Sequence, residues 1–418
     1  MFISSKQLIG SVAAAFALVL TSGATSPLVA QSVPGVTATE VVLGGLHPCS
    51  GPASAYCTIG KGAAAYFAYV NDKGGVNGRK ITYKDLDDAY SPPQAMQLAR
   101  QLVEQDHVFA MFNTLGTPSN TAIRPYLNQN QVPQLYVATG ATTWAHDSSQ
   151  YPWTIGWQPD YQSEAIIYAR NLLKVAPNAK IGVIYQNDDY GKDYLAGLHK
   201  GLGPKSSLIV KEVSYETTDP DVSSQIGQLK ASGADTFFIF ATPKFALQSL
   251  VIAAQQSWHP TIYLNNVSAN DVVMKGATEK GGATATAGVI SVGYLKDPLD
   301  PRWANDSGLA LFKQIMAKYA PGVDTSNLFY MYGCGAAYTM VDTLQKAGRD
   351  LTRQKLMDAA IHLNEANNPF VMPGIVVQTT PSNHFPITQE QLAKYDNGRF
   401  VPFGSIIDAR PIIASESK

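Results

Sequence analysis

Short apolar runs alternate with longer amphipathic stretches along most of the chain, and this alternation constrains the fold more than any other feature of the sequence. The first apolar runs, each with the length of a buried strand, cover 41–46, 81–86, 108–112 and 132–137. The stretches between them have helical periodicity and cover 60–71, 93–105 and 119–129. A strand-helix-strand order predicts parallel strands joined by right-handed crossovers.

The same alternation then starts again and predicts a second sheet. Its expected strands cover 180–185, 208–213, 236–240 and 261–264, with helices at 161–175, 190–202, 222–231 and 245–256. A third block has a strand at 288–292, helices at 303–319, 329–346 and 353–362, and strands at 375–378 and 401–407. A chain of 418 residues exceeds what one hydrophobic core usually supports. We therefore expect an α/β protein with two doubly wound parallel-sheet lobes and a cleft between them.

The first thirty residues have the pattern of a secretory signal peptide. Lys6 precedes an apolar run at 8–20, and small and polar residues follow as far as Ala30. The apolar run is shorter than the roughly 20 residues that span a bilayer. A buried N-terminal helix is the alternative interpretation. We expect cleavage after residue 30 and a soluble, periplasmic protein without membrane insertion.

Charge and cysteine content exclude several classes of function. The chain has 31 Lys and Arg against 32 Asp and Glu, so it lacks the basic surface expected of a nucleic-acid-binding protein. Cys49 and Cys57 lie close enough in one expected loop to form a disulfide after export, whereas Cys334 lies in an apolar helical stretch and is expected to be a buried thiol. The three cysteines have no zinc-site spacing, and we expect neither a metal nor a cofactor.

No motif in the sequence predicts an enzyme. His47 could be taken for a catalytic base, but no serine or cysteine nucleophile can be assigned to it from the sequence. Asp85, Asp87 and Asp88 are expected to stabilise turns and to pair with basic neighbours rather than to bind a metal. The Gly-x-Ser-x-Gly, His-Glu-x-x-His and phosphate-loop motifs are absent.

Several short motifs follow the expected strands in a characteristic order. They are Ser50-Gly51-Pro52, the Asn-Asp-Lys-Gly-Gly-Val-Asn-Gly stretch at 71–78, Asp87-Asp88, Gly140-Ala141-Thr142 and Asp189-Tyr190-Gly191. Together they resemble the periplasmic leucine/isoleucine/valine-binding proteins, which are type I solute-binding proteins of branched-chain amino-acid ABC importers. The resemblance covers nearly all of the chain after residue 30.

This resemblance implies the domain organisation and the partners. The lobes would be joined by three hinge crossovers near Gly156, Val292 and Met372. Residues 36–156 with 289–372 would form the first lobe, and residues 157–288 with 373–418 the second. A monomer would close over a small carboxylate-bearing ligand and deliver it to the permease and ATPase subunits of an importer. A ligand-sensing receptor of the same fold is the alternative function.

The resemblance also implies the residues that bind the ligand. Gly116 and Thr117 would hold the carboxylate at a helix N-terminus, with Ala141 and Thr142 as a second clamp. Tyr56 and Tyr190 would cover the ligand from opposite lobes. Thr117 could instead cap the helix, and this is the role that we expect for Ser119.

One departure from the family pattern bears on the ligand. Amino-acid binders of this family place an acidic residue after the strand corresponding to 261–264, where it pairs with the ligand ammonium. Here that stretch contains Asn265 and Asn266, and its first acid is Asp271, with Asp188 and Asp189 as possible substitutes. Because a buried ammonium needs a countercharge, this departure favours an acid without an amine. The aromatic residues expected near the cleft, Trp144 and Phe245, are compatible with an aromatic ligand, and Asn266 is expected to contact it.

Overall fold

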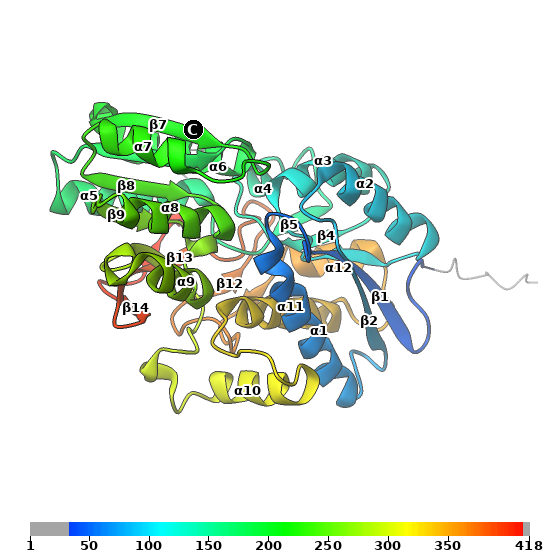
Figure 1. Ribbon diagram of the computed structural model, residues 1–418. Coiled ribbons are helices and arrows are strands. Elements are labelled where there is room, and N and C mark those ends of the chain that lie inside the picture. Colours follow the sequence, from blue (N-terminus) through cyan, green and yellow to red (C-terminus); the bar gives the residue numbers. More distant parts are fainter. Residues whose placement is uncertain (1–32, 413–418) are drawn as a thin grey trace, which may run out of the picture. The chain divides into compact units, whose positions relative to one another are not determined.

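An open parallel sheet of five strands forms the first part of the computed structural model, which describes residues 33–412 (Figure 1). The strand order is β2-β1-β3-β4-β5, and each neighbouring pair is parallel. The strands are β1 (Glu40–Leu46), β2 (Lys80–Leu86), β3 (Ala110–Phe112), β4 (Gln134–Val137) and β5 (Thr154–Gly156). The signal peptide expected at 1–30 lies outside the described residues.

Helices cover both faces of this first sheet. On one face α1 (Cys57–Asp72), α10 (Ser307–Tyr319), α11 (Leu328–Ala347) and α12 (Arg353–Ala360) share a hydrophobic cluster with Phe112. On the other face α2 (Pro92–Arg100) and α3 (Thr117–Gln129) pack against the adjacent residue, Met111. Because neighbouring side chains of a strand point to opposite faces, a short apolar run such as β3 supplies both cores.

The second sheet is mixed, which differs from the wholly parallel sheet expected from the sequence. Its order is β14-β13-β10-β9-β8-β6-β7, with β15 on β13. The strands are β6 (Ile181–Gln186), β7 (Ile209–Tyr215), β8 (Thr236–Phe240), β9 (Thr261–Leu264), β10 (Ile290–Gly293), β13 (Gln389–Asp396), β14 (Arg399–Pro402) and β15 (Ile407–Asp408). Strand β13 is antiparallel to both β10 and β14. The sequence analysis missed β13 because one of its inward positions is occupied by a buried glutamate, Glu390, rather than by an apolar residue.

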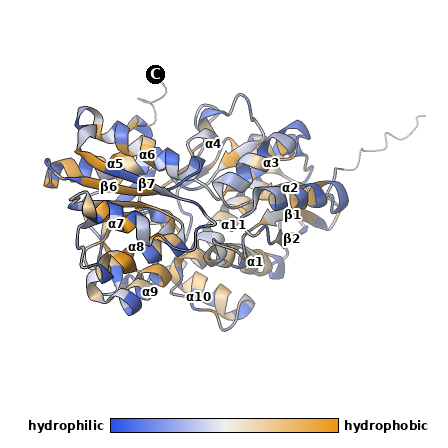
Figure 2. Cartoon of the chain, turned by 45° about the horizontal axis from the view of Figure 1, so that its top comes forward, coloured by the Kyte–Doolittle hydropathy of each residue, from blue (hydrophilic) through white to orange (hydrophobic). Residues whose placement is uncertain are grey.

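The central strand β8 shows how the second sheet is packed. Phe238 and Phe240 join a cluster with α5 (Tyr161–Val175) and α6 (Asp189–Leu202). Phe237 and Ile239 join α7 (Ser223–Ala231), α8 (Pro243–Gln255) and α9 (Asp271–Gly281) on the other face. Figure 2 shows hydrophobic residues concentrated on the strands between these helices and hydrophilic residues on outer parts of the helices. Helix α9 was not expected from the sequence.

The chain passes between the two sheets three times, as expected: after β5, after β10 and before β13. The residue ranges expected for the two lobes disagree with the observed sheets in two places. Strand β10 pairs with β9 in the second sheet, and Ile375, Val377 and Ile387 pack in the hydrophobic cluster of the first. The assignment of the other residues to lobes stays a prediction. Residues 33–412 contain no helix with the length and apolarity needed to cross a bilayer.

Helices α1 and α11 lie against each other through glycines (Figure 1). A Cβ atom on Gly62 would lie 2.4 Å from the carbonyl oxygen of Tyr330. A Cβ atom on Gly333 would lie 2.1 Å from the carbonyl oxygen of Ile59. The two backbones can approach this closely only because neither glycine carries a side chain. The expected burial of Cys334, in the same interface, is confirmed.

Replacing either glycine should separate the two helices. We expect Gly62→Ala and Gly333→Ala each to destabilise the protein by about 2–3 kcal/mol, because the clash is with backbone atoms that cannot turn away. Gly227→Ala is the matched control: it lies within α7 with no atom in reach of an added Cβ, and should stabilise by about 0.5–1 kcal/mol. Urea unfolding followed by circular dichroism measures all three. Equal midpoints for the three variants would contradict the close packing.

Candidate ligand-binding site

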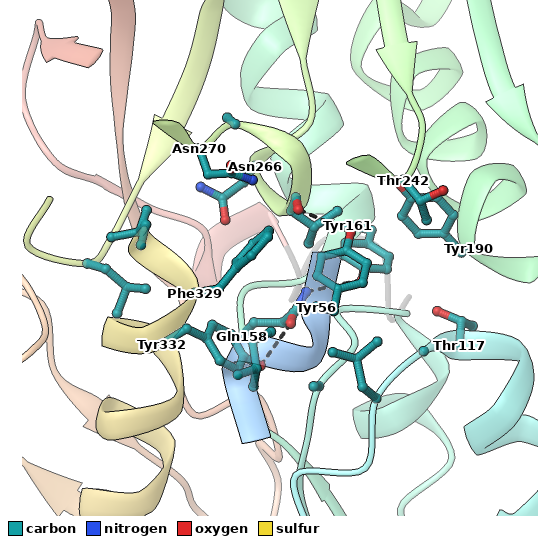
Figure 3. Close-up of a pocket in the computed structure, with 18 of the residues that line it drawn as sticks. Tyr56, Thr117, Gln158, Tyr161, Tyr190, Thr242, Asn266, Asn270, Phe329 and Tyr332 are labelled. Atoms are coloured by element: carbon teal, nitrogen blue, oxygen red, sulfur yellow. Dashed lines mark hydrogen bonds between the residues drawn. The ribbon is translucent and has the colours of Figure 1, made fainter. Parts of the chain in front are cut away.

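A cavity lies where loops that follow strands of both sheets meet helix α11. It encloses about 610 Å³ of unfilled space, including its opening to solvent. Its wall is mostly aromatic, and the rings belong to Tyr56, Tyr90, Tyr161, Tyr190, Tyr294, Phe329 and Tyr332. Figure 3 shows several of these rings around the cavity, on elements that are far apart in the sequence.

Hydrogen bonds hold the tyrosine hydroxyls in place. The Tyr56 hydroxyl donates to the carbonyl oxygen of Val267 at 3.1 Å, which joins a loop of the first sheet to a loop of the second. The Tyr332 hydroxyl donates to Oε1 of Gln158 at 2.9 Å, and Nε2 of Gln158 donates to the Tyr161 hydroxyl at 3.1 Å (Figure 3). Burial raises the pKa of Tyr56 and of Tyr161, so both hydroxyls are neutral at physiological pH.

The disulfide between Cys49 and Cys57 closes the loop that carries Tyr56, and its presence confirms the expected pairing. The Tyr56 ring then contacts Phe329 of α11, with 5.0 Å between the ring centroids. Tyr56 therefore connects the disulfide loop, helix α11 and the second sheet.

The loop between β3 and α3 brings Gly116 and Thr117 to the cavity, as the sequence analysis expected. Gly116 has a φ of 94°, and a Cβ there would lie 2.4 Å from the Tyr90 ring, so this turn requires glycine. Helix α3 begins at Thr117 with no side chain capping its first turn. The expectation that Ser119 caps the helix is therefore corrected. Thr117 Oγ1 lies 2.7 Å from Thr139 Oγ1, so the two hydroxyls form a hydrogen bond.

Asn266 and Asn270 form the part of the wall that follows β9. The Asn266 side chain donates to the carbonyl oxygen of Val292 at 2.6 Å. Asn270 caps α9 by accepting a hydrogen bond from the backbone N–H of Val273. Figure 3 shows these two asparagines on one side of the cavity and Thr117, Tyr190 and Thr242 on the other.

No Asp, Glu, Lys, Arg or His occurs among the described residues that line the cavity. The acids that could have paired with a ligand ammonium lie elsewhere. Asp271 lines a neighbouring cavity, Asp188 caps α6, and Asp189 lines a third hollow. The wall is therefore polar only through hydroxyl, amide and backbone groups.

Two buried carboxyl groups lie behind the wall, and they differ in their hydrogen bonds. Glu164 accepts hydrogen bonds from the backbone N–H of Asn266 and from the hydroxyls of Tyr168 and Tyr194. Burial raises its pKa to about 7. Burial and the nearby Glu164 carboxyl also raise the pKa of Glu390, whose oxygens have no hydrogen-bond partner in the described part of the chain.

Ala141 and Thr142 do not reach this cavity, and the expected second carboxylate clamp is corrected. They line a separate hollow together with Arg124 and Asp193. The Thr142 backbone N–H donates to Asp193 Oδ2 at 2.8 Å, and its hydroxyl bonds to Asp193 and to Asp160. A ligand carboxylate placed there would face two acidic side chains, which is electrostatically unfavourable.

Phe245 and Trp144 are also placed away from the cavity. Phe245 is fully buried in the core beneath α8, with its ring centroid 4.3 Å from that of Tyr215. Trp144 lines the hollow beside Thr142 and has the Arg124 guanidinium 4.5 Å from its ring centroid. Ligand contacts from these two aromatic residues are not supported.

The structure adds wall residues that the sequence analysis did not identify. These are Tyr90, Gln158, Tyr161, Thr242, Tyr294, Phe329 and Tyr332, among others. Thr242 follows β8, so the strand-end rule could have found it. Phe329 and Tyr332 lie on a helix distant in sequence from every other part of the site, and no local pattern distinguishes them from core residues.

His47 has a structural role. Its ring is fully buried, with Nδ1 2.8 Å from Asp85 Oδ1 and Nε2 3.4 Å from Asn113 Oδ1. The Asp87 carboxylate accepts hydrogen bonds from the backbone N–H groups of Cys49 and Ala89, and so stabilises the disulfide loop. The described residues contain no cluster of His, Cys, Asp and Glu suited to a metal ion.

Comparisons with known sequences identify a family. A family profile described as "Periplasmic binding protein" matches residues 40–399. The Leu/Ile/Val-binding protein homolog 3 of Brucella melitensis is 28% identical over 204 residues, which cover 48% of this chain and 54% of that protein. The leucine-specific-binding protein of Salmonella typhimurium is 22% identical over 202 residues, with coverages of 48% and 54%. The matched part thus spans about half the length of these curated relatives.

Comparisons with solved structures show the same fold at low sequence identity. A branched-chain amino acid ABC transporter protein from Thermus thermophilus, with bound valine, has a TM-score of 0.80 at 16% identity, over 91% of this chain and 99% of that one. A fatty acid ABC transporter substrate-binding protein from Thermomonospora curvata has a TM-score of 0.76 at 20% identity, with coverages of 92% and 96%. A solute-binding protein from R. palustris in complex with benzoate has a TM-score of 0.75 at 17% identity, with coverages of 89% and 98%.

The resemblance inferred from the motifs is thereby confirmed. The family profile extends over most of the chain, and the structural neighbours cover both sheets of a type I binding-protein fold. The chain belongs to the periplasmic binding protein family, in the group that resembles the leucine/isoleucine/valine-binding proteins.

Proposed function

We propose that this protein is the extracytoplasmic solute-binding component of an ABC importer, and that it binds a small carboxylic acid with an aromatic or aliphatic body and no α-amino group. The observation that carries this proposal is the cavity wall, which is rich in tyrosine and contains no charged residue. Such a wall binds apolar surface and a few hydrogen-bonding groups. The protein acts as a monomeric periplasmic receptor without enzymatic activity and delivers the solute to permease and ATPase subunits.

The carboxylate is assigned to the loop of Gly116 and Thr117. The uncapped first turn of α3 offers backbone N–H groups together with the positive end of the helix dipole. The Thr117 hydroxyl can turn from Thr139 to the ligand, because the two hydroxyls bond only through their rotatable protons.

An α-amino acid fits this wall less well. Its ammonium lies one carbon from the carboxylate, so it would be buried among rings and amides without a carboxylate partner. Burying an unpaired charge costs several kcal/mol. The structural neighbours include one protein with bound valine and one with bound benzoate, and the uncharged wall favours a benzoate-like ligand for this chain.

Closure over the ligand is supported by contacts that already join the two parts of the chain. The hydroxyl of Tyr56 bonds to Val267, and the hydroxyl of Ser326 donates to Asp271 Oδ2 at 3.0 Å. A ligand that fills the cavity adds apolar contacts to both sides and so favours the closed arrangement. The permease would then distinguish loaded from empty protein by this arrangement.

A ligand panel tests the ligand class. We expect benzoate-like and phenylacetate-like acids to raise the melting temperature of the purified protein, and leucine and valine to raise it much less. A ligand at a hundredfold excess over its Kd adds about 2.7 kcal/mol, which thermal-shift measurements detect readily. A shift with leucine or valine alone would contradict the amine-free assignment.

A substitution tests the carboxylate site. Thr117→Val should weaken binding of the best acid about tenfold or more, because a buried hydrogen bond to a charged group is worth about 1.5–3 kcal/mol. Thr218→Val, at an exposed position remote from the wall, is the matched control and should leave the Kd unchanged. Titration calorimetry measures both. An unaltered Kd for Thr117→Val, with an unaltered melting temperature, would place the carboxylate elsewhere.

A further inference from the structure

A second cavity adjoins the first and shares part of its wall. It encloses about 720 Å³ of unfilled space, including its opening. The residues common to both cavities are Asn266, Ala269, Asn270, Tyr294, Leu295 and Leu328. The two cavities are therefore direct neighbours across these residues, and the second has a different lining.

The second cavity is charged, and its charges do not balance. Its lining contains the acids Asp271, Asp297 and Asp300 against the bases Arg302 and Arg399. Both arginines approach the same acid: Asp300 lies 2.6 Å from Arg302 and 3.8 Å from Arg399. The Asp300 side chain is only 2% exposed, so its charge is compensated within the protein by the two arginines.

Asp271 and Asp297 are left without a basic partner among the described residues. Asp297 accepts one hydrogen bond, from the backbone N–H of Leu299 at 2.9 Å, and Asp271 accepts one from the Ser326 hydroxyl. Burial raises the pKa of Asp297 to about 6, and the carboxylates of Asp300 and Asp271 add to this increase, against the opposing effect of Arg399. A cation bound beside Asp297 would relieve this repulsion.

Aromatic side chains complete the lining. Trp303, Tyr395 and Phe400 border the compartment, and the rings of Tyr395 and Phe400 lie 5.2 Å apart. The Trp303 ring already has the Arg302 guanidinium 4.9 Å from its centroid. Burial raises the pKa of Tyr395, and the carboxylates of Asp271 and Asp297 lie close enough to raise it further. An aromatic ring next to carboxylates suits an organic ammonium group, because ring electrons attract a cation while the carbon atoms of the group bury apolar surface.

The hydroxyl of Thr117 and the carboxylates of the second cavity lie at opposite ends of the two adjoining cavities. Thr117 lines only the first cavity, whereas Asp271 and Asp297 line only the second. Asn266 and Asn270, which border both, lie across the first cavity from Thr117 (Figure 3). A ligand held at Thr117 therefore reaches the second cavity only with its far end.

We propose that the second cavity is a subsite for the distal end of the same ligand, and that Asp297 and Asp271 bind a protonated amine there, so that the physiological solute is an elongated acid whose amine is remote from its carboxylate. This inference rests on the proposed function, which assigns the carboxylate to Gly116 and Thr117. It differs from recognition of an α-amino acid, whose ammonium would stay in the uncharged cavity.

The test compares matched probes by titration calorimetry on the mature protein. One series consists of benzoates with a para-aminoalkyl chain of increasing length, and the other of the para-alkyl benzoates of equal length. We expect the amine to strengthen binding about tenfold at the chain length that reaches the second cavity and to have no benefit at the shortest length. The gain should decline as the pH falls through about 6, because Asp297 then becomes protonated.

Variants assign the effect to the acids. The ratio of the two Kd values, with and without the amine, should fall to about one in Asp297→Asn and decrease in Asp271→Asn. Asp350→Asn, at an exposed position outside both cavities, is the matched control and should keep the wild-type ratio. Taking the ratio within each variant removes any general effect of the substitution on folding.

The outcomes separate this inference from the proposed function. Equal affinities of the two series at every length, with both binding, would overturn the second subsite and leave the carboxylate site intact. Binding of para-alkyl benzylamine probes as tightly as that of the carboxylate-bearing amines, lost in Asp297→Asn, would support the subsite and contradict the carboxylate assignment. Failure of every probe to bind would overturn both.

Discussion

The close contact between α1 and α11 is the interaction on which the rest of the site depends. Two helices separated by more than half of the chain meet through Gly62 and Gly333 at a distance that no side chain would permit. Tyr56 directly precedes α1, and Phe329 and Tyr332 lie on α11, so the separation of the two helices sets the position of all three rings in the cavity wall. The disulfide at Cys49 and Cys57 fixes the same loop from its other end.

Electrostatics distinguish the wall of the first cavity from the structure behind it. Acids are present nearby, but the protein itself uses their hydrogen-bonding capacity: Glu164 is held by a backbone N–H and two tyrosines, and Asp188 caps a helix. The ligand therefore meets hydroxyl and amide groups rather than charges. Among the described residues that line the two cavities, carboxylates without a basic partner are found in the adjoining compartment, beyond Asn266 and Asn270. Because a neutral cavity adjoins a charged one, the proposed ligand carries its carboxylate and its amine at opposite ends.

The rule that ligands bind at the carboxyl ends of parallel strands predicted part of the wall and failed in informative places. Tyr56, Gly116, Thr117, Tyr190 and Asn266 follow strands and line the cavity. Thr142 follows a strand as well, but its hydroxyl is engaged by Asp160 and Asp193 in a neighbouring hollow. Phe245 lies within the first turn of α8, where its ring turns into the core against Tyr215. Position after a strand fixes where a residue lies along the sheet edge and leaves the direction of its side chain open.

The sequence by itself determined the α/β class, most of the strands and helices, the two sheets and the lack of an acid directly after β9, because these follow from local periodicity and residue identity. It allowed a bond between Cys49 and Cys57, and the structure shows that bond. The tertiary structure alone decided the antiparallel strand around Glu390, the aromatic residues that α11 contributes, the partners of Thr142 and the second cavity. Each of these depends on contacts between residues far apart in the chain. Local patterns carry no information on such contacts, because packing between distant segments selects the side chains that face one another.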